Sequence, residues 1–224
     1  PVANAVLFPG VVLPVVITGD AALAGAQEAV RTQRRVGLLL QTDPSAGASG
    51  SGDASGTTGP SLDLLHRVGT AASIVRFITA PDGTHHLICQ GEERFTVLDY
   101  VSRDPFLVAR IEAHKEPTVL DREVEARGLS LRERALEAVQ LLPQVPGELV
   151  NAIRSIESVA TLADMVVSFM DLKVAEKQEI LATFDLKTRL DRVLKLLDRR
   201  IEVLKVSRQI DERTREAFDE RQKE

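Results

Sequence analysis

The chain has 224 residues, of which 44% are hydrophobic and 27% are charged, and its formal net charge is −5. This composition is that of an ordinary globular protein, with room for one large domain or two small ones. The acidic balance, the absence of tryptophan and the single tyrosine argue against nucleic-acid binding, which needs a basic surface and aromatic stacking. No apolar run approaches the ~20 residues of a membrane span, and one cysteine permits no internal disulfide, which favours a reducing cytoplasm.

The first half of the chain has the pattern of a β-rich fold. Short apolar runs rich in Val, Ile and Phe alternate with turn residues, which predicts strands at 11–17, 36–40, 71–78, 86–90, 95–101 and 106–111. The sequence Pro81-Asp82-Gly83-Thr84 predicts a hairpin turn, because glycine adopts a positive φ at little cost. The exception is 21–35, where the apolar residues have a helical period and Asp20 is the expected N-cap.

The first predicted strand contains two prolines, Pro9 and Pro14, within the run AVLFPGVVLPVVI. Proline has no backbone N–H to donate, so within sheets it occurs at edges, strand starts and bulges. We therefore expect a bend at Pro9-Gly10 and an edge or bulge at Pro14, which would protect the edge against pairing with other chains.

Residues 43–60 are nearly all Gly, Ser, Ala and Thr. Such a segment buries too little apolar surface to offset the entropy lost on ordering, so it is interpreted as a mobile surface loop. From about residue 117 the pattern becomes helical, with predicted helices at 119–142, 147–156, 158–170, 174–184 and from 186 to the end. The last helix carries an apolar stripe that thins after Val206.

The sequence offers no recognisable catalytic or cofactor site. A P-loop needs a Gly-Lys pair, and none occurs. His85 and His86 are adjacent and would point to opposite faces of a strand, so they make a poor metal site. Cys89 lies in an apolar strand, where a buried thiol is usually inert. We therefore expect no catalytic residue, metal or cofactor in this segment.

Several short motifs, in order, resemble the N-terminal domain of the Lon ATP-dependent protease family. The resemblance covers essentially the whole chain. In the first half it rests on AVLFPGVVLPVVI, on residues 68–72, on 81–84, and on 90–92 with Arg94-Phe95. In the second half it rests on 145–149, 162–164, 172–173, 176–181 and 189–190.

The resemblance implies an α+β fold of two parts. Residues 1–116 would form a β-rich, PUA-like subdomain with one helix, and 117–224 a helical bundle. The long helix from about 186 would lead into an ATPase module that is absent here. ATP and Mg²⁺ would bind in that module, and a Ser–Lys protease domain would cut the substrate, in a cytoplasmic homohexamer.

The function implied by this resemblance is non-catalytic recognition of damaged or unfolded proteins, with a second role in assembly. Large apolar residues near turns or in a soft, Met-containing patch are the predicted substrate contacts. They are Phe77, Leu87, Phe106, Met165, Phe169 and Met170. Ile210 and Phe218, in the charged end of the last helix, are the predicted assembly contacts.

Three alternatives stay open at this stage. A free-standing protein- or ligand-binding module of the same fold would lack a motor, and its last helix should end in a cap. An RNA-binding PUA-like module should have a basic face, yet residues 1–114 hold eight arginines, no lysine and eleven acidic residues. A hydrolase that uses Cys89 should lose its activity on Cys89→Ala.

Overall fold

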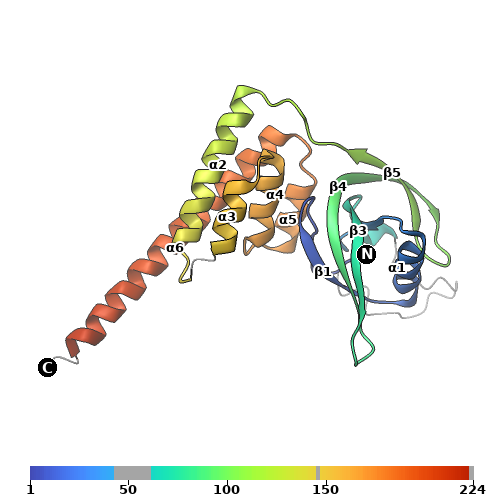
Figure 1. The fold of residues 1–224 in the computed structure, drawn as a ribbon, viewed down its shortest axis with the longest axis horizontal. Coiled ribbons are helices and arrows are strands. Elements are labelled where there is room, and N and C mark those ends of the chain that lie inside the picture. The colour runs from blue at the N-terminus through green and yellow to red at the C-terminus, as the bar shows by residue number, and fades with distance from the viewer. Residues whose placement is uncertain (43–61, 145–146, 222–224) are drawn as a thin grey trace. The chain divides into compact units, whose positions relative to one another are not determined.

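The computed structural model describes residues 1–42, 62–144 and 147–221, with side chains as far as residue 214 (Figure 1). The fold is α+β, as predicted. The described strands form one sheet, and helices dominate the chain after residue 121. The loop predicted at 43–60 lies outside the described residues. The chain divides into two compact units: Pro1–Glu116 with Val167–Phe184, and Pro117–Val166 with Asp185–Glu224.

Strand β1 (Val12–Ile17) lies at an edge of the sheet, whose order is β1-β4-β3-β2, with β5 paired to β4. Pro9 and Gly10 form the turn before it, and Gly10 has a φ of 79°. An edge strand tolerates Pro14 because some of its backbone groups face no neighbouring strand. The predicted bend and the predicted edge position of Pro14 are both confirmed.

A long hairpin of β3 (Val68–Thr79) and β4 (His85–Ser102) forms the centre of the sheet. The predicted hairpin turn is confirmed: Gly83 has a φ of 83°, and its N–H donates to the carbonyl of Ala80 at 2.9 Å. Figure 1 shows the elongated strands of this hairpin.

The two strands predicted at 86–90 and 95–101 are one continuous strand, so that prediction is wrong. Ala72 pairs with Gly91 and Ala71 with Glu93, which leaves Glu92 as an extra residue in a bulge. A bulge absorbs one residue without ending the strand, whereas a turn would reverse it.

The shorter strands complete the sheet. β2 (Val36–Leu38) pairs with β3, and β5 (Val108–His114) pairs with the second half of β4. β1 pairs with the first half of β4, so β4 has a paired strand on both sides at residues 85–90 and 94–96. A short 3₁₀ helix, η1 (Leu62–Leu64), precedes β3.

Helix α1 (Asp20–Thr32) covers the core side of the sheet, where Ala26 packs with buried residues of β1 and β4. The predicted cap is wrong: Gly19, with a φ of 88°, is the N-cap, and Asp20 is the first helical residue. No side chain caps this end, and the Asp20 carboxylate instead lies in the first turn, where it complements the helix dipole.

The second half contains the predicted helices, most of them shortened by a few residues. Helix ends fray, so observed bounds commonly differ from a sequence pattern by a residue or two. Their bounds are α2 (Arg122–Gln140), α3 (Gly147–Ser155), α4 (Val159–Phe169), α5 (Val174–Leu181) and α6 (Leu186–Arg221). The boundary between the two units falls inside α4, so α5 groups with the sheet.

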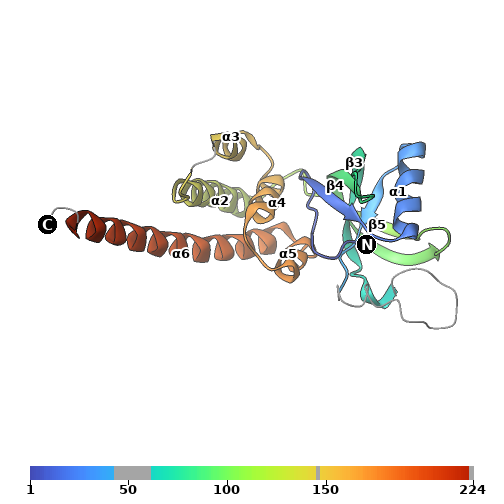
Figure 2. The same cartoon turned by 90° about the horizontal axis from the view of Figure 1, so that it is seen from below.

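Within the second unit, α2 and α6 pack along each other (Figure 2). Ion pairs join them at a constant spacing: Glu123 to Lys187, Arg127 to Asp191 at 2.6 Å, and Arg134 to Asp198 at 3.2 Å. A constant offset between paired residues means that the two helices run parallel. The buried stripe of α6, from Leu186 to Ile201, supplies the apolar contact, and exposed ion pairs add little.

The Asp121 side chain caps α2 by accepting a hydrogen bond from the Val124 N–H at 2.8 Å. We expect Asp121→Ala to destabilise the helical unit by about 1 kcal/mol, because an orphan N–H loses its acceptor. Thermal unfolding followed by circular dichroism measures the loss. Asp121→Asn keeps an acceptor and should unfold close to the wild type, so equal losses in the two variants would contradict the capping role.

Candidate functional site

One face of the sheet of the first unit carries exposed apolar side chains. The strand register sets its residues in three rows across β1, β4 and β3. The rows are Val16–His86–Ile78, Pro14–Ile88–Arg76 and Val12–Gln90–Ser73. These nine residues, with Val75, are here termed the outer sheet face.

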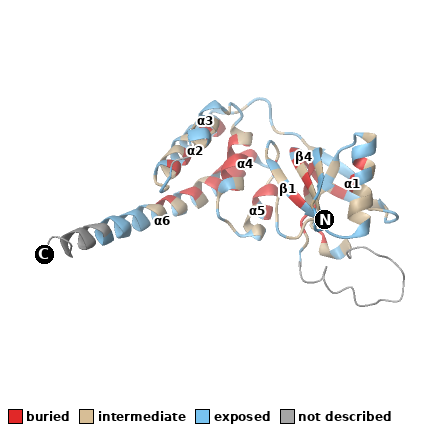
Figure 3. Ribbon diagram, turned by 60° about the horizontal axis from the view of Figure 1, so that its bottom comes forward, coloured by how far each residue is buried: buried red, intermediate tan, exposed pale blue. Residues whose placement is uncertain are grey.

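The outer sheet face exists because β1 is apolar on both sides. Leu13 and Val15 point into the core with Leu87 and Cys89, so the alternating residues point the other way. Val12 and Val16 are 53% and 51% exposed. Figure 3 shows buried and exposed residues side by side along the strands of this sheet. Contiguous exposed apolar side chains of this kind usually mark an interaction site.

A bulge enlarges the apolar area of this face. Ile74 pairs with Cys89 and Arg76 with Ile88, which leaves Val75 as an extra residue that is 60% exposed. Bulges redirect side chains and are common beside functional sites. Val75 therefore adds a valine next to the central row.

The carboxylates near the outer sheet face, Glu92 and Asp82, accept hydrogen bonds from neighbouring residues. Glu92 accepts hydrogen bonds from Ser73 and from Arg35. The Asp82 carboxylate, at the hairpin turn, accepts hydrogen bonds from the hydroxyl and N–H of Thr84, which lower the pKa of Asp82. The Arg76 side chain is exposed and makes no hydrogen bond or ion pair with any described residue.

Three of the predicted substrate contacts lie in or against the core of the first unit. Leu87 is 4% exposed, and Phe77 packs against the same cluster with its ring 5.6 Å from that of His85. Phe106 packs against α1, where a Cβ added at Gly25 would lie 3.2 Å from the Phe106 Cβ. Leu87 in particular has no surface to offer a partner.

The soft patch predicted on α4 is only partly at the surface. Met165 is buried and Met170 half-buried, whereas Phe169, at the end of α4, is 68% exposed. The helical period that brings these residues to one face also turns most of that face inward. Phe169 is the most exposed of the six predicted substrate contacts.

Of the predicted assembly contacts, Ile210 is 58% exposed on α6 and the Phe218 side chain lies outside the described residues. Val203 and Val206 are also exposed on this helix. The three residues follow at steps of three and four, so they form one stripe. Figure 3 shows this part of α6 mostly as exposed.

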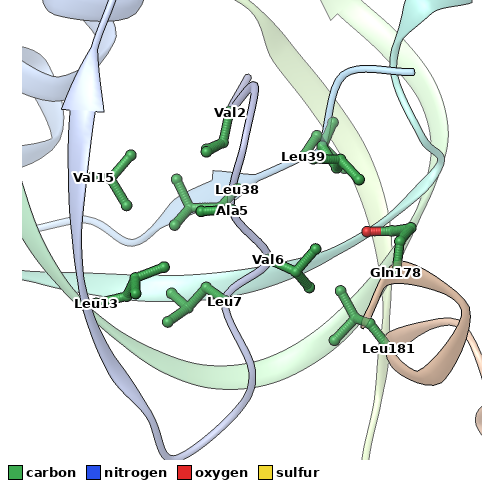
Figure 4. A pocket seen from close by; sticks show the side chains of 11 residues that line it. Val2, Ala5, Val6, Leu7, Leu13, Val15, Leu38, Leu39, Gln178 and Leu181 are labelled. Carbon is green, nitrogen blue, oxygen red and sulfur yellow. The ribbon is translucent and has the colours of Figure 1, made fainter. Parts of the chain in front are cut away.

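A small hollow of about 10 Å³, roughly the space of one water molecule, lies between the N-terminal segment, β1, β2 and α5 (Figure 4). Its lining is aliphatic except for Gln178. The Gln178 Nε2 donates to the carbonyl of Val68 at 2.9 Å, while its Oε1 has no hydrogen-bond partner among the described residues. One amide among aliphatic side chains cannot activate a nucleophile or hold a metal, so the hollow is a packing feature.

Among the described residues, Cys89, His85 and His86 are the remaining candidates for reactive groups. Cys89 is fully buried, and burial raises the pKa of its thiol to about 11, so it stays protonated at neutral pH. His85 and His86 make separate hydrogen-bond contacts with Thr79 and Thr84. In the described part of the chain, no three His, Cys, Asp or Glu side chains cluster as a metal site would require, and no helix is long and apolar enough to cross a bilayer.

The most buried charge of the first unit has a structural role. Arg94, on β4, is 1% exposed; its Nε donates to the carbonyl of Leu181 at 3.0 Å, and its guanidinium pairs with Glu116 at 2.8 Å. A buried guanidinium needs such partners, because an unpaired charge away from water is costly. Arg94 therefore attaches α5 and the end of the first unit to the sheet.

Comparison with known proteins assigns the family. The sequence model of the ATP-dependent protease La (LON) substrate-binding domain matches residues 1–199. The chain belongs to the Lon substrate-binding domain family. It is 49% identical over its whole length to the Lon protease of Methylocella silvestris and 47% identical to that of Phenylobacterium zucineum. It spans about a quarter of the length of these relatives, 26% and 27%.

Solved structures of Lon N-terminal domains have the same fold. The domain from the Mycobacterium avium complex Lon protease superimposes with a TM-score of 0.66 over 88% of this chain and 95% of its own, at 20% identity. The Lon N-terminal domain protein from Xanthomonas campestris gives a TM-score of 0.56 over 86% of this chain and 93% of its own, at 18% identity. The resemblance inferred from the short motifs and the predicted fold class are thus confirmed.

The outer sheet face was not among the predicted contacts, although the sequence carries a signal for it. In the run from Val11 to Ile17 both alternating sets of residues are apolar, which is typical of a strand buried on both faces. Pro14 indicates an edge strand, and an edge strand is seldom covered on both faces. The two signals together point to an exposed apolar face.

Proposed function

We propose that this segment captures protein substrates for an ATP-dependent, Lon-type protease and does no chemistry itself. The observation that carries the proposal is the outer sheet face, an exposed apolar surface in a chain of the Lon substrate-binding domain family. The motor, with its ATP and Mg²⁺, and the Ser–Lys protease centre would lie in other parts of a longer, cytoplasmic protein.

Apolar chemistry suits this task because damaged or unfolded chains differ from folded ones chiefly in the apolar segments that they expose. Val12, Val16, Val75 and Ile78 would lose water when such a segment covers them. Each contact is weak. In a ring of six copies, linked sites would raise the effective concentration and hold the substrate by avidity.

Phe169 would supply a second apolar contact, with Met170 beside it. Its exposure of 68% is unusual for a phenylalanine, a residue that is mostly buried. Met170 is half-buried and flexible enough to adapt to different partners.

The experiment compares the binding of one protein in two states. The 224-residue chain is immobilised and exposed to a reduced, carboxymethylated protein that cannot fold, and separately to its native form. We expect the unfolded form to bind at least tenfold more tightly. Photo-crosslinkers placed at Val16 and Phe169 should then react with the unfolded form. Equal binding of the two forms would remove the receptor role.

The same chain tests the alternatives. A nucleic-acid module would bind RNA with a steep salt dependence, yet the outer sheet face holds one arginine among mostly apolar residues. A hydrolase would need Cys89 as a nucleophile, and burial keeps that thiol protonated. A free-standing receptor without a motor would bind unfolded protein equally well, so the reading frame that encodes the intact protein distinguishes it.

Assembly is the second part of the proposal. The exposed stripe Val203, Val206 and Ile210 has the three- and four-residue spacing of a coiled-coil seam, and it lies on a helix whose charged residues would keep it soluble. A second copy of this helix is the proposed occupant, because an identical stripe is complementary to it.

We expect Ile210→Asp to shift the 224-residue chain towards monomer, because a carboxylate would be buried in the seam. Sedimentation velocity across a concentration series measures the shift. Arg208→Gln changes the net charge by the same amount on the opposite side of α6, where residues two apart do not share a face, and is the control that should dimerise like the wild type. If both variants sediment like the wild type at every concentration, α6 does not pair through this stripe.

A further inference from the structure

One charged side chain interrupts the outer sheet face. Arg76 lies in the central row, across from Ile88 and Pro14, with Val75 beside it in the chain. Ile78 lies two residues further along the same strand and on the same side. The row of Arg76 is otherwise aliphatic, while the rows on either side also hold His86, Gln90 and Ser73.

No acidic group of the described residues neutralises this guanidinium. The acidic residues near the face have other partners: Asp82 is held by Thr84, and Glu92 by Ser73 and Arg35. The guanidinium of Arg76 makes no hydrogen bond or ion pair with a described residue. Exposed arginines elsewhere in the chain, such as Arg31 and Arg110, do pair with carboxylates on their own elements or on neighbouring strands.

This arrangement has a consequence for any segment that covers the face. A purely apolar segment would strip water from Arg76 and leave a buried charge without a partner, which opposes binding. A segment with a carboxylate between its apolar residues would instead form charge-assisted hydrogen bonds with the planar guanidinium, in two-point geometry.

We propose that the outer sheet face selects apolar segments that carry a carboxylate opposite Arg76. The inference rests on the proposed function and names its substrate class: unfolded segments in which an Asp, a Glu or a free chain terminus is flanked by aliphatic residues. The apolar rows supply most of the contact area, and Arg76 supplies the discrimination.

The test uses fluorescent peptides of one aliphatic sequence whose central residue is Glu, Gln or Lys. Binding to the 224-residue chain is measured by fluorescence anisotropy. We expect the Glu peptide to bind about tenfold more tightly than the Lys peptide, with the Gln peptide between them. The Gln peptide is also made in two forms, one with a free and one with an amidated C-terminus. Tighter binding of the free form would show that a terminal carboxylate can pair with Arg76 in place of Glu.

Two variants locate the preference. Arg76→Glu should reverse it, so that the Lys peptide binds best, and Arg76→Gln should abolish it. Arg103→Glu changes the net charge of the chain equally, at an exposed arginine beyond the end of β4, and should leave the preference unchanged. High salt should weaken the preference more than the binding itself.

The outcomes separate this inference from the proposed function. If all peptides bind alike and Arg76→Glu changes nothing, while Val16→Asp removes binding, the receptor function stands and the role of Arg76 is refuted. If Arg103→Glu reverses the preference as Arg76→Glu does, the selection comes from overall charge and the inference is again overturned. If no peptide binds the wild type, both proposals fail.

Discussion

Replacing Val16 by aspartate is expected to reduce the affinity for unfolded protein at least tenfold while the fold persists. Val16 is half-exposed and lies in the row with His86 and Ile78. A covering segment would bury the new carboxylate among aliphatic side chains, and a loss of ~1.4 kcal/mol already corresponds to a factor of ten. Equilibrium binding of the carboxymethylated protein measures the loss.

Two controls give this prediction its specificity. Val16→Thr keeps the β-branched shape without a charge and should bind within a fewfold of the wild type. Val101→Asp places the same carboxylate on an exposed strand residue at the far end of β4, outside the outer sheet face. If Val101→Asp loses as much affinity as Val16→Asp, binding is not located on this face. Circular dichroism confirms that each variant is folded.

Replacing Gly91 by alanine is expected to have the largest effect on stability. A Cβ at this position would lie 2.2 Å from the carbonyl oxygen of Phe8 and 3.2 Å from the Thr70 Cγ2. The neighbouring backbone cannot retreat freely, because the N–H of Gly91 donates to Val11 at 2.9 Å and its carbonyl accepts from Gly10 at 2.9 Å. Overpacking against fixed backbone costs about 3 kcal/mol.

Thermal unfolding measures this loss, which corresponds to a midpoint lower by about 10 °C for a chain of this size. Gly147→Ala is the matched control, because a Cβ there would meet no atom within 4 Å and alanine favours the helix that begins at Gly147. A Gly91→Ala variant as stable as the wild type would mean that the segment before β1 does not press against β4.

The burial of Arg94 shows why some of the fold was beyond sequence reasoning. From the sequence it is one of eight scattered arginines of the first half. Its partners, Glu116 and the carbonyl of Leu181, are 22 and 87 residues away. Only the folded chain brings α5 against the sheet, and residues 167–184 group with the first unit.

Some features of the candidate site follow from the local sequence, and others follow only from the tertiary structure. The aliphatic stripe of α6 and the edge position of Pro14 follow from local spacing and from the missing N–H. Leu87 looked as available as Val16, because hydrophobicity says that a residue is apolar but not which way it points. The register of β1 on β4 puts Leu87 opposite Val15 in the core and leaves Val16 outside.

The sequence alone determined the order of strands and helices, the turns at Gly10 and Gly83, and the lack of a catalytic motif, since each depends on residues close together in the chain. The tertiary structure decided that two predicted strands are one, that α5 belongs with the sheet, and which apolar side chains reach the surface. Those outcomes depend on strand register, bulges and packing between distant segments. A shift of one residue in register would exchange the buried and exposed residues of β1. Because β1 is apolar on both sides, its local sequence does not distinguish the correct register from the shifted one.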